Sequence, residues 1–350
     1  MAKEKRLAPG EATTVSPPAD GTPIVIQVAS ESAARHIGWR ILMFVLPLSV
    51  LLNITFLINQ AAESAAQSAG VVSRHHSGSE SASDKLAVIH FTGTIMPPFT
   101  ERWLKQIKAA REDETVRGVL LAIDSPGGLV ADSHQLYYEL QKLKAEKTVY
   151  VCMKRMAASG GYYIAVAGGE SSRIFAEPTT WTGSIGVIIP RYNASELGAN
   201  VGVKVEPLVT GPYKDSLNPF RDLTDSEVQV WDAILADSFE RFVGVIADNR
   251  PRLDADGVRA LATGQIYTAN QAVANGMVDE IGYEEDALQS LADALKLTDY
   301  EVISYGATPS LLDTLLSSAT KQEQTTLEIL LESSTPRAMY YCSWSPWIPQ

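Results

Sequence analysis

Residues 148–165 read TVYVCMKRMAASGGYYIA and decide the fold of this 350-residue chain. The apolar run at 148–153 predicts a buried parallel strand, and the small and apolar residues from 160 onward predict a helix. Ser159 therefore lies on a glycine-flanked turn at a helix N-terminus, where free N–H groups favour a developing negative charge. Such a turn suits a nucleophile. Small residues here would equally permit close packing of a helix on a sheet, so the turn alone leaves both interpretations open.

Around this turn, apolar strands alternate with amphipathic helices from Lys85 onward. Repeated units of this kind predict an α/β fold with a mainly parallel sheet, in one domain over residues 85–305. A capping box at Thr224 and Glu227 predicts the start of a long helix. Strands are predicted at 86–91, 116–124, 148–153, 173–176, 185–189, 203–209, 265–267 and 300–304.

The segments outside this domain have different compositions. Residues 1–37 are rich in Pro, Ala and Thr and predict a disordered segment. Residues 61–84 are rich in Ala, Ser and Gly and predict a flexible linker, in which His75 and His76 are expected to be solvated. Residues 306–350 are expected to form a C-terminal tail.

Residues 41–58 are uncharged and apolar, and they predict one transmembrane anchor over residues 38–60. A cleaved signal peptide is the alternative, because small residues follow the run, but the long preceding segment and the long apolar core favour an anchor. Arg35 and Arg40 precede the run, and no basic residue follows it until Arg74. This asymmetry predicts a single-pass membrane protein with its N-terminus in the cytoplasm and its main domain outside.

Charge and cysteine content exclude several classes of protein. The formal net charge is −12, and no cluster of Lys and Arg resembles a nucleic-acid-binding surface, so no nucleic-acid partner is expected. Cys152 and Cys342 do not suggest a disulfide framework. The chain has no phosphate-binding loop, dinucleotide fingerprint or zinc motif, so neither a cofactor nor a metal ion is expected.

Two further segments suggest a site. The sequence DSPGG at 124–128 follows the most hydrophobic strand, and its glycines either point backbone N–H groups into a cleft or only form a tight turn. Lys214 lies in GPYKDS, where it is either a general base or a solvated surface charge. A serine–histidine–aspartate triad would need His134, which we expect on a helix surface, and this alternative stays open.

These segments match one family in order and in approximate spacing. DSPGG at 124–128, AASGGYYIA at 157–165, WTGSIGV at 181–187, GPYKDS at 211–216 and ANGMVDEIG at 274–282 together resemble the S49 serine peptidases of the signal peptide peptidase type (SppA). The resemblance implies a ClpP/crotonase-like fold and a Ser-Lys dyad. It implies that Ser159 is the nucleophile, Lys214 the general base and Ser184 a hydrogen-bond partner of the lysine amine. It also implies that the N–H groups of Gly128 and Gly160 form the oxyanion hole.

The resemblance further implies a membrane-anchored serine endopeptidase that degrades remnant signal peptides outside the cytoplasm. Its expected partners are peptide substrates, the membrane and other copies of the chain, arranged in a ring in which neighbouring subunits supply serine and lysine. Two alternatives compete with it. A non-catalytic membrane-anchored scaffold of the same fold would not need the filled dyad positions, and a crotonase-like acyl-CoA enzyme would not need the predicted anchor.

Overall fold

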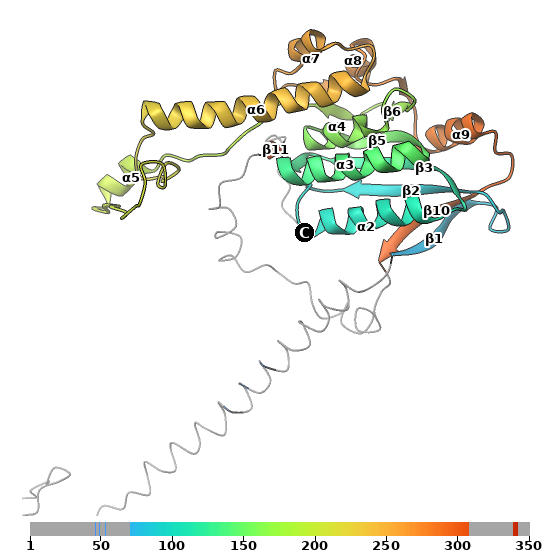
Figure 1. The fold of residues 1–350 in the computed structure, drawn as a ribbon, viewed down its shortest axis with the longest axis horizontal. Coiled ribbons are helices and arrows are strands. Elements are labelled where there is room, and N and C mark those ends of the chain that lie inside the picture. Colours follow the sequence, from blue (N-terminus) through green and yellow to red (C-terminus); the bar gives the residue numbers. More distant parts are fainter. Residues whose placement is uncertain (1–45, 47–48, 50–52, 54–70, 308–338, 342–350) are drawn as a thin grey trace, which may run out of the picture. The chain divides into compact units, whose positions relative to one another are not determined.

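The centre of the molecule is a largely parallel β-sheet covered by helices on both faces (Figure 1). The structure is a computed structural model that describes residues 46, 49, 53, 71–307 and 339–341. In this part of the chain nine strands form the sheet, along the order β1-β10-β2-β3-β5-β6-β9, with β7 and β8 attached beside β5. Strands β1 and β8 pair antiparallel to their neighbours, and the other pairs are parallel. The strands are β1 Val71–Gly78, β2 Lys85–Thr92, β3 Val116–Ser125, β5 Thr148–Ala158, β6 Ile174–Ala176, β7 Trp181–Gly183, β8 Ile266–Thr268, β9 Glu280–Ile281 and β10 Glu301–Ala307.

The central strands are apolar at nearly every position because both faces of the sheet are buried. On β2, Ile89 and Phe91 belong to the core shared with α2, α3, α4 and α6, whereas Leu86 and Val88 pack in the core beneath α9. The helices are α2 Phe99–Glu112, α3 Val130–Glu146, α4 Gly160–Ala165, α5 Ser195–Asn200, α6 Asp225–Asn249, α7 Ala255–Leu261, α8 Ala269–Ala274 and α9 Glu284–Leu295, with the short 3-10 helix η1 Val166–Gly168. The α/β class with a mainly parallel sheet is therefore confirmed.

A second, two-stranded sheet consists of β4 (Gly127–Leu129) and β11 (Met339–Tyr341), which pair antiparallel. Strand β4 contains the end of the DSPGG segment, and β11 comes from the predicted C-terminal tail. The tail thus contributes a short strand beside the loop that follows β3.

Three sequence-based expectations differ from the structure. The predicted linker contains strand β1, which forms the sheet edge against β10; its exposed polar side chains conceal the strand pattern. The strands predicted at 185–189 and 203–209 do not form. Residues 203–209 are exposed, and no neighbouring strand pairs with them in the described chain.

The predicted membrane anchor over residues 38–60 lies outside the described residues, apart from Leu46, Ser49 and Asn53. Within the described part of the chain, no helix combines the length and hydropathy needed to span a bilayer. The predicted segment 1–37 also lies outside the described residues.

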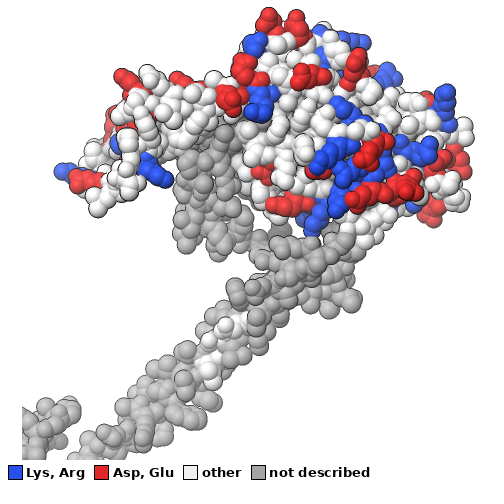
Figure 2. Space-filling model, in the orientation of Figure 1, with Lys and Arg blue, Asp and Glu red and all other residues white. Residues whose placement is uncertain are grey.

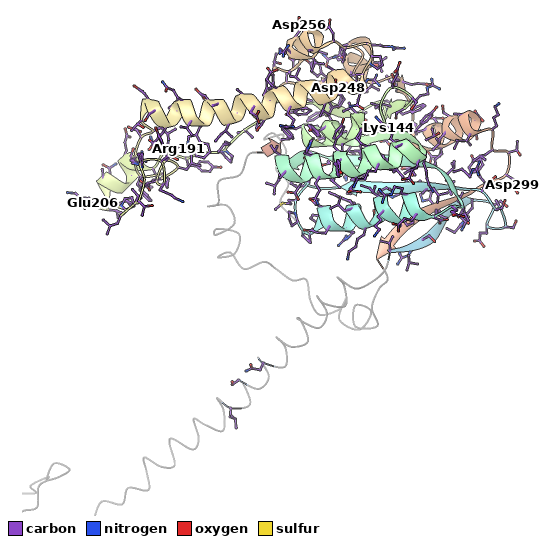
Figure 3. All side chains as sticks on the ribbon, viewed as in Figure 1. Lys144, Arg191, Glu206, Asp248, Asp256 and Asp299 are labelled. Carbon is purple, nitrogen blue, oxygen red and sulfur yellow. The ribbon has the colours of Figure 1, made fainter. Side chains whose placement is uncertain are left out.

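Residues 191–231 form a projection that we call the arm. It contains α5 and the outer part of α6, which begins with the predicted capping box of Thr224 and Glu227. In Figure 1 the arm extends beyond α3 and α4, and in Figure 3 Arg191 and Glu206 mark it while Asp248 marks the inner end of α6. Polar contacts within the arm stabilise it: Arg221 binds the carboxylates of Asp215 and Glu227, and Trp231 donates to Ser216.

The arm exposes an unusual amount of apolar surface. Figure 2 shows that uncharged surface covers most of it, between scattered charges. Large apolar side chains this exposed in one segment are typical of an interaction surface. They are Tyr192, Leu197, Val201, Leu208, Phe220 and Val228.

The inner end of α6 is joined to the sheet by a buried ion pair. The guanidinium of Arg250 donates to both carboxylate oxygens of Asp279, at 2.9 and 2.7 Å, and to the carbonyl of Gly276. Burial alone would raise the pKa of Asp279, but the bonds from Arg250 and from the N–H of Ile174 hold it below the usual range. The pair therefore stabilises the fold at neutral pH, and its contribution is lost as the pH falls through the pKa of the folded state.

We expect Arg250→Met to lower the free energy of unfolding by about 3–5 kcal/mol at pH 7, because it leaves the Asp279 carboxylate buried and unpaired. Denaturant titration followed by circular dichroism measures this. The matched control is Arg259→Met, which removes an exposed ion pair. The side chains of Arg259 and Glu240 are 43% and 54% exposed, whereas those of Arg250 and Asp279 are 5% and 20% exposed. The control substitution should therefore lower the free energy of unfolding by less than about 1 kcal/mol. Equal effects of the two substitutions would contradict the assignment.

Candidate active site

Ser159 lies on a strained turn between β5 and α4. Its backbone angles are φ 54° and ψ −116°, a conformation that side-chain-bearing residues rarely adopt and that costs about 1–3 kcal/mol. Two hydrogen bonds hold the turn: Ser159 N–H donates to the carbonyl of Gly183 at 2.7 Å, and Tyr163 N–H donates to the carbonyl of Ser159 at 2.9 Å. The turn therefore joins the end of β5 to both β7 and α4.

The Ser159 side chain is buried without a partner. The residue is 1% exposed, and its Oγ has no hydrogen-bond partner among the described residues. Leaving a buried hydroxyl unpaired costs about 1–3 kcal/mol, and most buried polar side-chain atoms in proteins have a partner. Together with the strained backbone, this makes Ser159 the most unusual polar residue of the described core.

Three glycines bring backbone N–H groups close to Ser159. A Cβ atom on Gly160 would lie 3.1 Å from the nitrogen of Gly128, and one on Gly127 would lie 2.6 Å from the nitrogen of Gly160. Gly127 also has a φ of 96°, which favours glycine. The nitrogens of Gly128 and Gly160, which belong to segments 32 residues apart in sequence, thus lie around one small space. Two such donors beside a hydroxyl can stabilise an oxyanion.

The packing interpretation of the glycines holds as well. A Cβ on Gly161 would lie 2.7 Å from the carbonyl oxygen of Ser125, and one on Gly128 would lie 2.0 Å from that of Ile95. The Ser-Gly-Gly and Gly-Gly pairs therefore serve close backbone approach in addition to any chemistry.

Ser184 lies near the nucleophile candidate. It follows Gly183, whose carbonyl accepts from Ser159, and its own N–H donates to the carbonyl of Gln265 at 2.7 Å. Its φ of 49° is again in the region that side chains rarely adopt. Four of the five predicted site residues, namely Ser159, Ser184, Gly128 and Gly160, therefore gather around β5, β7 and β4.

Lys214 is the exception. It is exposed on the arm, where its backbone N–H donates to Gly211, and the unpaired state of Ser159 Oγ shows that the two side chains do not meet within this chain. The arm runs away from α4 in Figures 1 and 3. One chain thus presents the serine and the lysine in different places.

His134 takes part in a different contact. Its Nδ1 shares a 2.7 Å hydrogen bond with the hydroxyl of Tyr163, and it does not bond Ser159 Oγ. Burial, with a smaller effect from Arg241, lowers the pKa of His134. The triad alternative therefore lacks its central contact. No group of three His, Cys, Asp or Glu side chains in the described residues is placed to hold a metal ion.

The sequence analysis does not predict the aromatic cluster that lies beside the site. Tyr163, one turn after Ser159, packs against Phe242 of α6 and Tyr340 of β11, with ring centroids 5.0 and 5.1 Å apart. Tyr340 is fully buried. The only sequence signal was the spacing of Tyr163 from Ser159, because the other two rings come from distant segments.

Comparison with known proteins gives the family. The model of peptidase family S49 matches residues 141–298, and that of Clp protease matches residues 76–182. A protein from Enterococcus faecium, provisionally named signal peptide peptidase SppA, is 39% identical over 254 residues, covering 69% of this chain and 73% of the relative. Protease 4 of Salmonella typhi is 32% identical over 66% of this chain and 37% of its own length. The chloroplastic serine protease SPPA of Arabidopsis thaliana is 30% identical over 57% of this chain and 31% of its own length.

The match to the Clp protease model agrees with the mainly parallel sheet of the structure. The match to the Enterococcus protein spans nearly three quarters of that protein, so it concerns the main domain and not one motif. The chain belongs to peptidase family S49, and it is a serine-type endopeptidase.

Proposed function

We propose that Ser159 and Lys214 form the catalytic dyad of a membrane-anchored endopeptidase, with Lys214 supplied by a neighbouring copy of the chain. The observation that carries this proposal is the buried hydroxyl of Ser159, which lies on a strained turn beside two backbone N–H groups and has no hydrogen-bonded base among the described residues of its own chain. A base from another subunit would complete it.

In the proposed mechanism, Ser159 Oγ attacks the carbonyl carbon of the scissile peptide bond while Lys214 Nζ, in its neutral form, accepts the hydroxyl proton. The carbonyl oxygen becomes an oxyanion, which the N–H groups of Gly128 and Gly160 stabilise. Ser184 accepts or donates a hydrogen bond at the lysine amine and keeps it directed at Ser159.

The tetrahedral intermediate then collapses. The carbon–nitrogen bond breaks, Lys214 returns its proton to the leaving amine, and the remaining acyl group stays esterified to Ser159. Lys214 next removes a proton from a water molecule, whose oxygen attacks the ester carbonyl. The second product leaves with a new carboxylate, and Ser159 recovers its proton.

The arm supports a ring of subunits. Its exposed apolar side chains suit a partner surface, and the arm, which carries the exposed Lys214, extends away from α4 (Figure 1). A head-to-tail contact places different surfaces of two copies against each other, and repetition of that contact gives a ring where the rotation between neighbouring copies closes. Each interface would then contain one Ser159 and one Lys214.

The substrates and location that we propose rest on the sequence and on the names of relatives. The Enterococcus relative carries the name signal peptide peptidase, and remnant signal peptides are short apolar segments left at the membrane. The apolar run at 41–58 would anchor the chain beside them, and the arginines that precede it would keep the N-terminus in the cytoplasm.

The first prediction concerns the nucleophile. A fluorophosphonate should label the wild-type chain, and Ser159→Ala should abolish labelling and lower kcat by about 10⁴-fold or more. The matched control is Ser172→Ala, since Ser172 is another buried serine whose Oγ lacks a partner. Labelling of the Ser159→Ala chain would exclude Ser159 as nucleophile, and absence of labelling in the wild type would favour the scaffold or the acyl-CoA enzyme.

The second prediction concerns the shared site. Ser159→Ala and Lys214→Ala chains should each be inactive, but mixing equal amounts under conditions of subunit exchange should restore activity. Random assembly leaves about a quarter of the interfaces with both wild-type residues. Mixing Ser159→Ala with the double variant Ser159→Ala/Lys214→Ala is the control and should stay inactive. If exchange is demonstrated by labelling and the first mixture is still inactive, the dyad lies within one chain.

The third prediction concerns topology. An alkaline phosphatase reporter fused after residue 84 should be active in intact bacterial cells, because that enzyme needs the oxidising environment outside the cytoplasm. A fusion after residue 30, before the apolar run, is the control and should be inactive. The opposite pattern would contradict the orientation.

A further inference from the structure

Strand β5 is irregular shortly before it reaches the serine turn. It pairs with β6 before this point and with β7 after it. On its other edge the register with β3 shifts, because Ile123 is opposite Met153 whereas Ser125 is opposite Ala157. Extra residues of β5 therefore bulge out at positions 154–156, a segment that we call the bulge. Since a bulge bends a strand and redirects the residues that follow it, this one sets the position of the serine turn.

The loop that joins β6 to β7 wraps around the bulge. The buried hydroxyl of Thr180 donates to the carbonyl of Met153 at 3.0 Å and also to the carbonyl of Lys154. The N–H of Glu177 donates to the same Met153 carbonyl at 3.0 Å, and the N–H of Thr180 donates to the carbonyl of Glu177 at 3.0 Å. A bulge interrupts the hydrogen bonds of a sheet, and these contacts replace them.

The amine of Lys154 joins the bulge to two carboxylates. Its Nζ lies 2.6 Å from Glu177 Oε1 and 3.2 Å from Glu284 Oε2. Glu284 is the first residue of α9, and its other oxygen lies 3.3 Å from His76 Nε2. Burial alone would lower the pKa of the Lys154 amine, but Glu177 and Glu284 raise it above its ordinary value, so the amine is charged at neutral pH. One cation therefore connects the bulge, the loop after β6 and the start of α9.

A second ion pair at the bulge is more exposed. Arg155 Nε donates to Asp124 Oδ2 at 2.6 Å, but the Arg155 side chain is 77% exposed, so water screens this pair. The carboxylates beside Lys154 are mostly buried. Without the amine, these two like charges would face each other with little water between them and would push the loop after β6 away from α9. Loss of the Lys154 charge should therefore disturb the bulge.

We propose that Lys154 is a positioning residue of the reaction, which holds the bulge of β5 so that the turn presents the Ser159 hydroxyl to the two oxyanion donors. The inference rests on the proposed role of Ser159 as nucleophile. Lys154 acts through the strand, because the residues after the bulge pair with β7 and lead directly to the bond from Ser159 N–H to the carbonyl of Gly183. A misplacement of about 1 Å can lower the rate of a reaction about 100-fold.

Fluorophosphonate labelling of the full-length Lys154→Met chain tests this role. The labelling rate constant should fall about 10- to 100-fold, because the turn is displaced while the chain stays folded. The value of kcat should fall by a similar factor, and KM should stay within about twofold of the wild-type value. If Lys154 only stabilised the fold, fewer molecules would be labelled, but the folded molecules would react at the wild-type rate. Lys154→Arg retains the charge and should restore most of the labelling rate.

The matched control is Lys142→Met on α3. It removes another lysine–glutamate pair with a 2.6 Å contact, to Glu139, and the two lysine side chains are similarly exposed, at 39% for Lys142 and 30% for Lys154. The control should leave the labelling rate constant unchanged. A folded Lys154→Met chain that is labelled at the wild-type rate would overturn the inference.

Hydrogen exchange tests the positioning without depending on the reaction. The amide of Ser159 is protected by its 2.7 Å bond to the carbonyl of Gly183. In mass spectrometry of residues 156–163, Lys154→Met should make this amide exchange about 10-fold faster or more, and Lys142→Met should not. Equal exchange in Lys154→Met and wild type would overturn the inference. If fluorophosphonate fails to label the wild type, the proposed function is contradicted, and faster exchange in Lys154→Met still supports the role of Lys154 in holding the turn.

Discussion

The hydrogen bond from Ser159 N–H to the carbonyl of Gly183 is the constraint on which the rest of the site depends. Strand β5 reaches its end at Ala158, and this bond holds the next residue to β7 in a backbone conformation that would otherwise relax. The same bond sets the position of Ser184, one residue after Gly183, and the start of α4, whose first N–H belongs to Gly160. One interaction between two strands therefore positions the hydroxyl, the N–H group of Gly160 that we propose as an oxyanion donor, and the second serine.

The sheet carries Ser159 at the end of β5, and the arm carries Lys214. Strands β2, β3 and β5 are buried on both faces, and the ends of β3 and β5 lead into the glycines and the serine, as is usual where parallel sheets bind ligands. The arm is stabilised by its own ion pairs at Arg221 and exposes its apolar side chains. If Lys214 is the base, as we propose, the sheet holds the nucleophile and the arm holds the base, and activity would then require assembly.

The sequence predicted the features that depend on local pattern. The central strands, the capping box at Thr224 and the turn at Ser159 follow from apolar runs, a short polar motif and paired glycines, and all three appear in the structure. The edge strand β1 could not be predicted, because its exposed polar residues lack the alternation of a half-buried strand. Strand β11 could not be predicted either, since three residues become a strand only through their contact with β4. The parallel fold explains why Gly128 and Gly160 lie close together. The structure of a single chain does not bring Lys214 to Ser159, so this contact could not be derived from the fold of one chain.

Helix α6 has a consequence for communication between sites. Its 25 residues span about 37 Å, and they include both Phe242 in the aromatic cluster beside the site and Trp231 in the arm. The same helix therefore contacts the core beside the serine turn at one end and forms part of the exposed arm at the other. In an assembled ring this single element would transmit the state of one site to the next, so that successive sites would respond cooperatively to peptide concentration instead of independently.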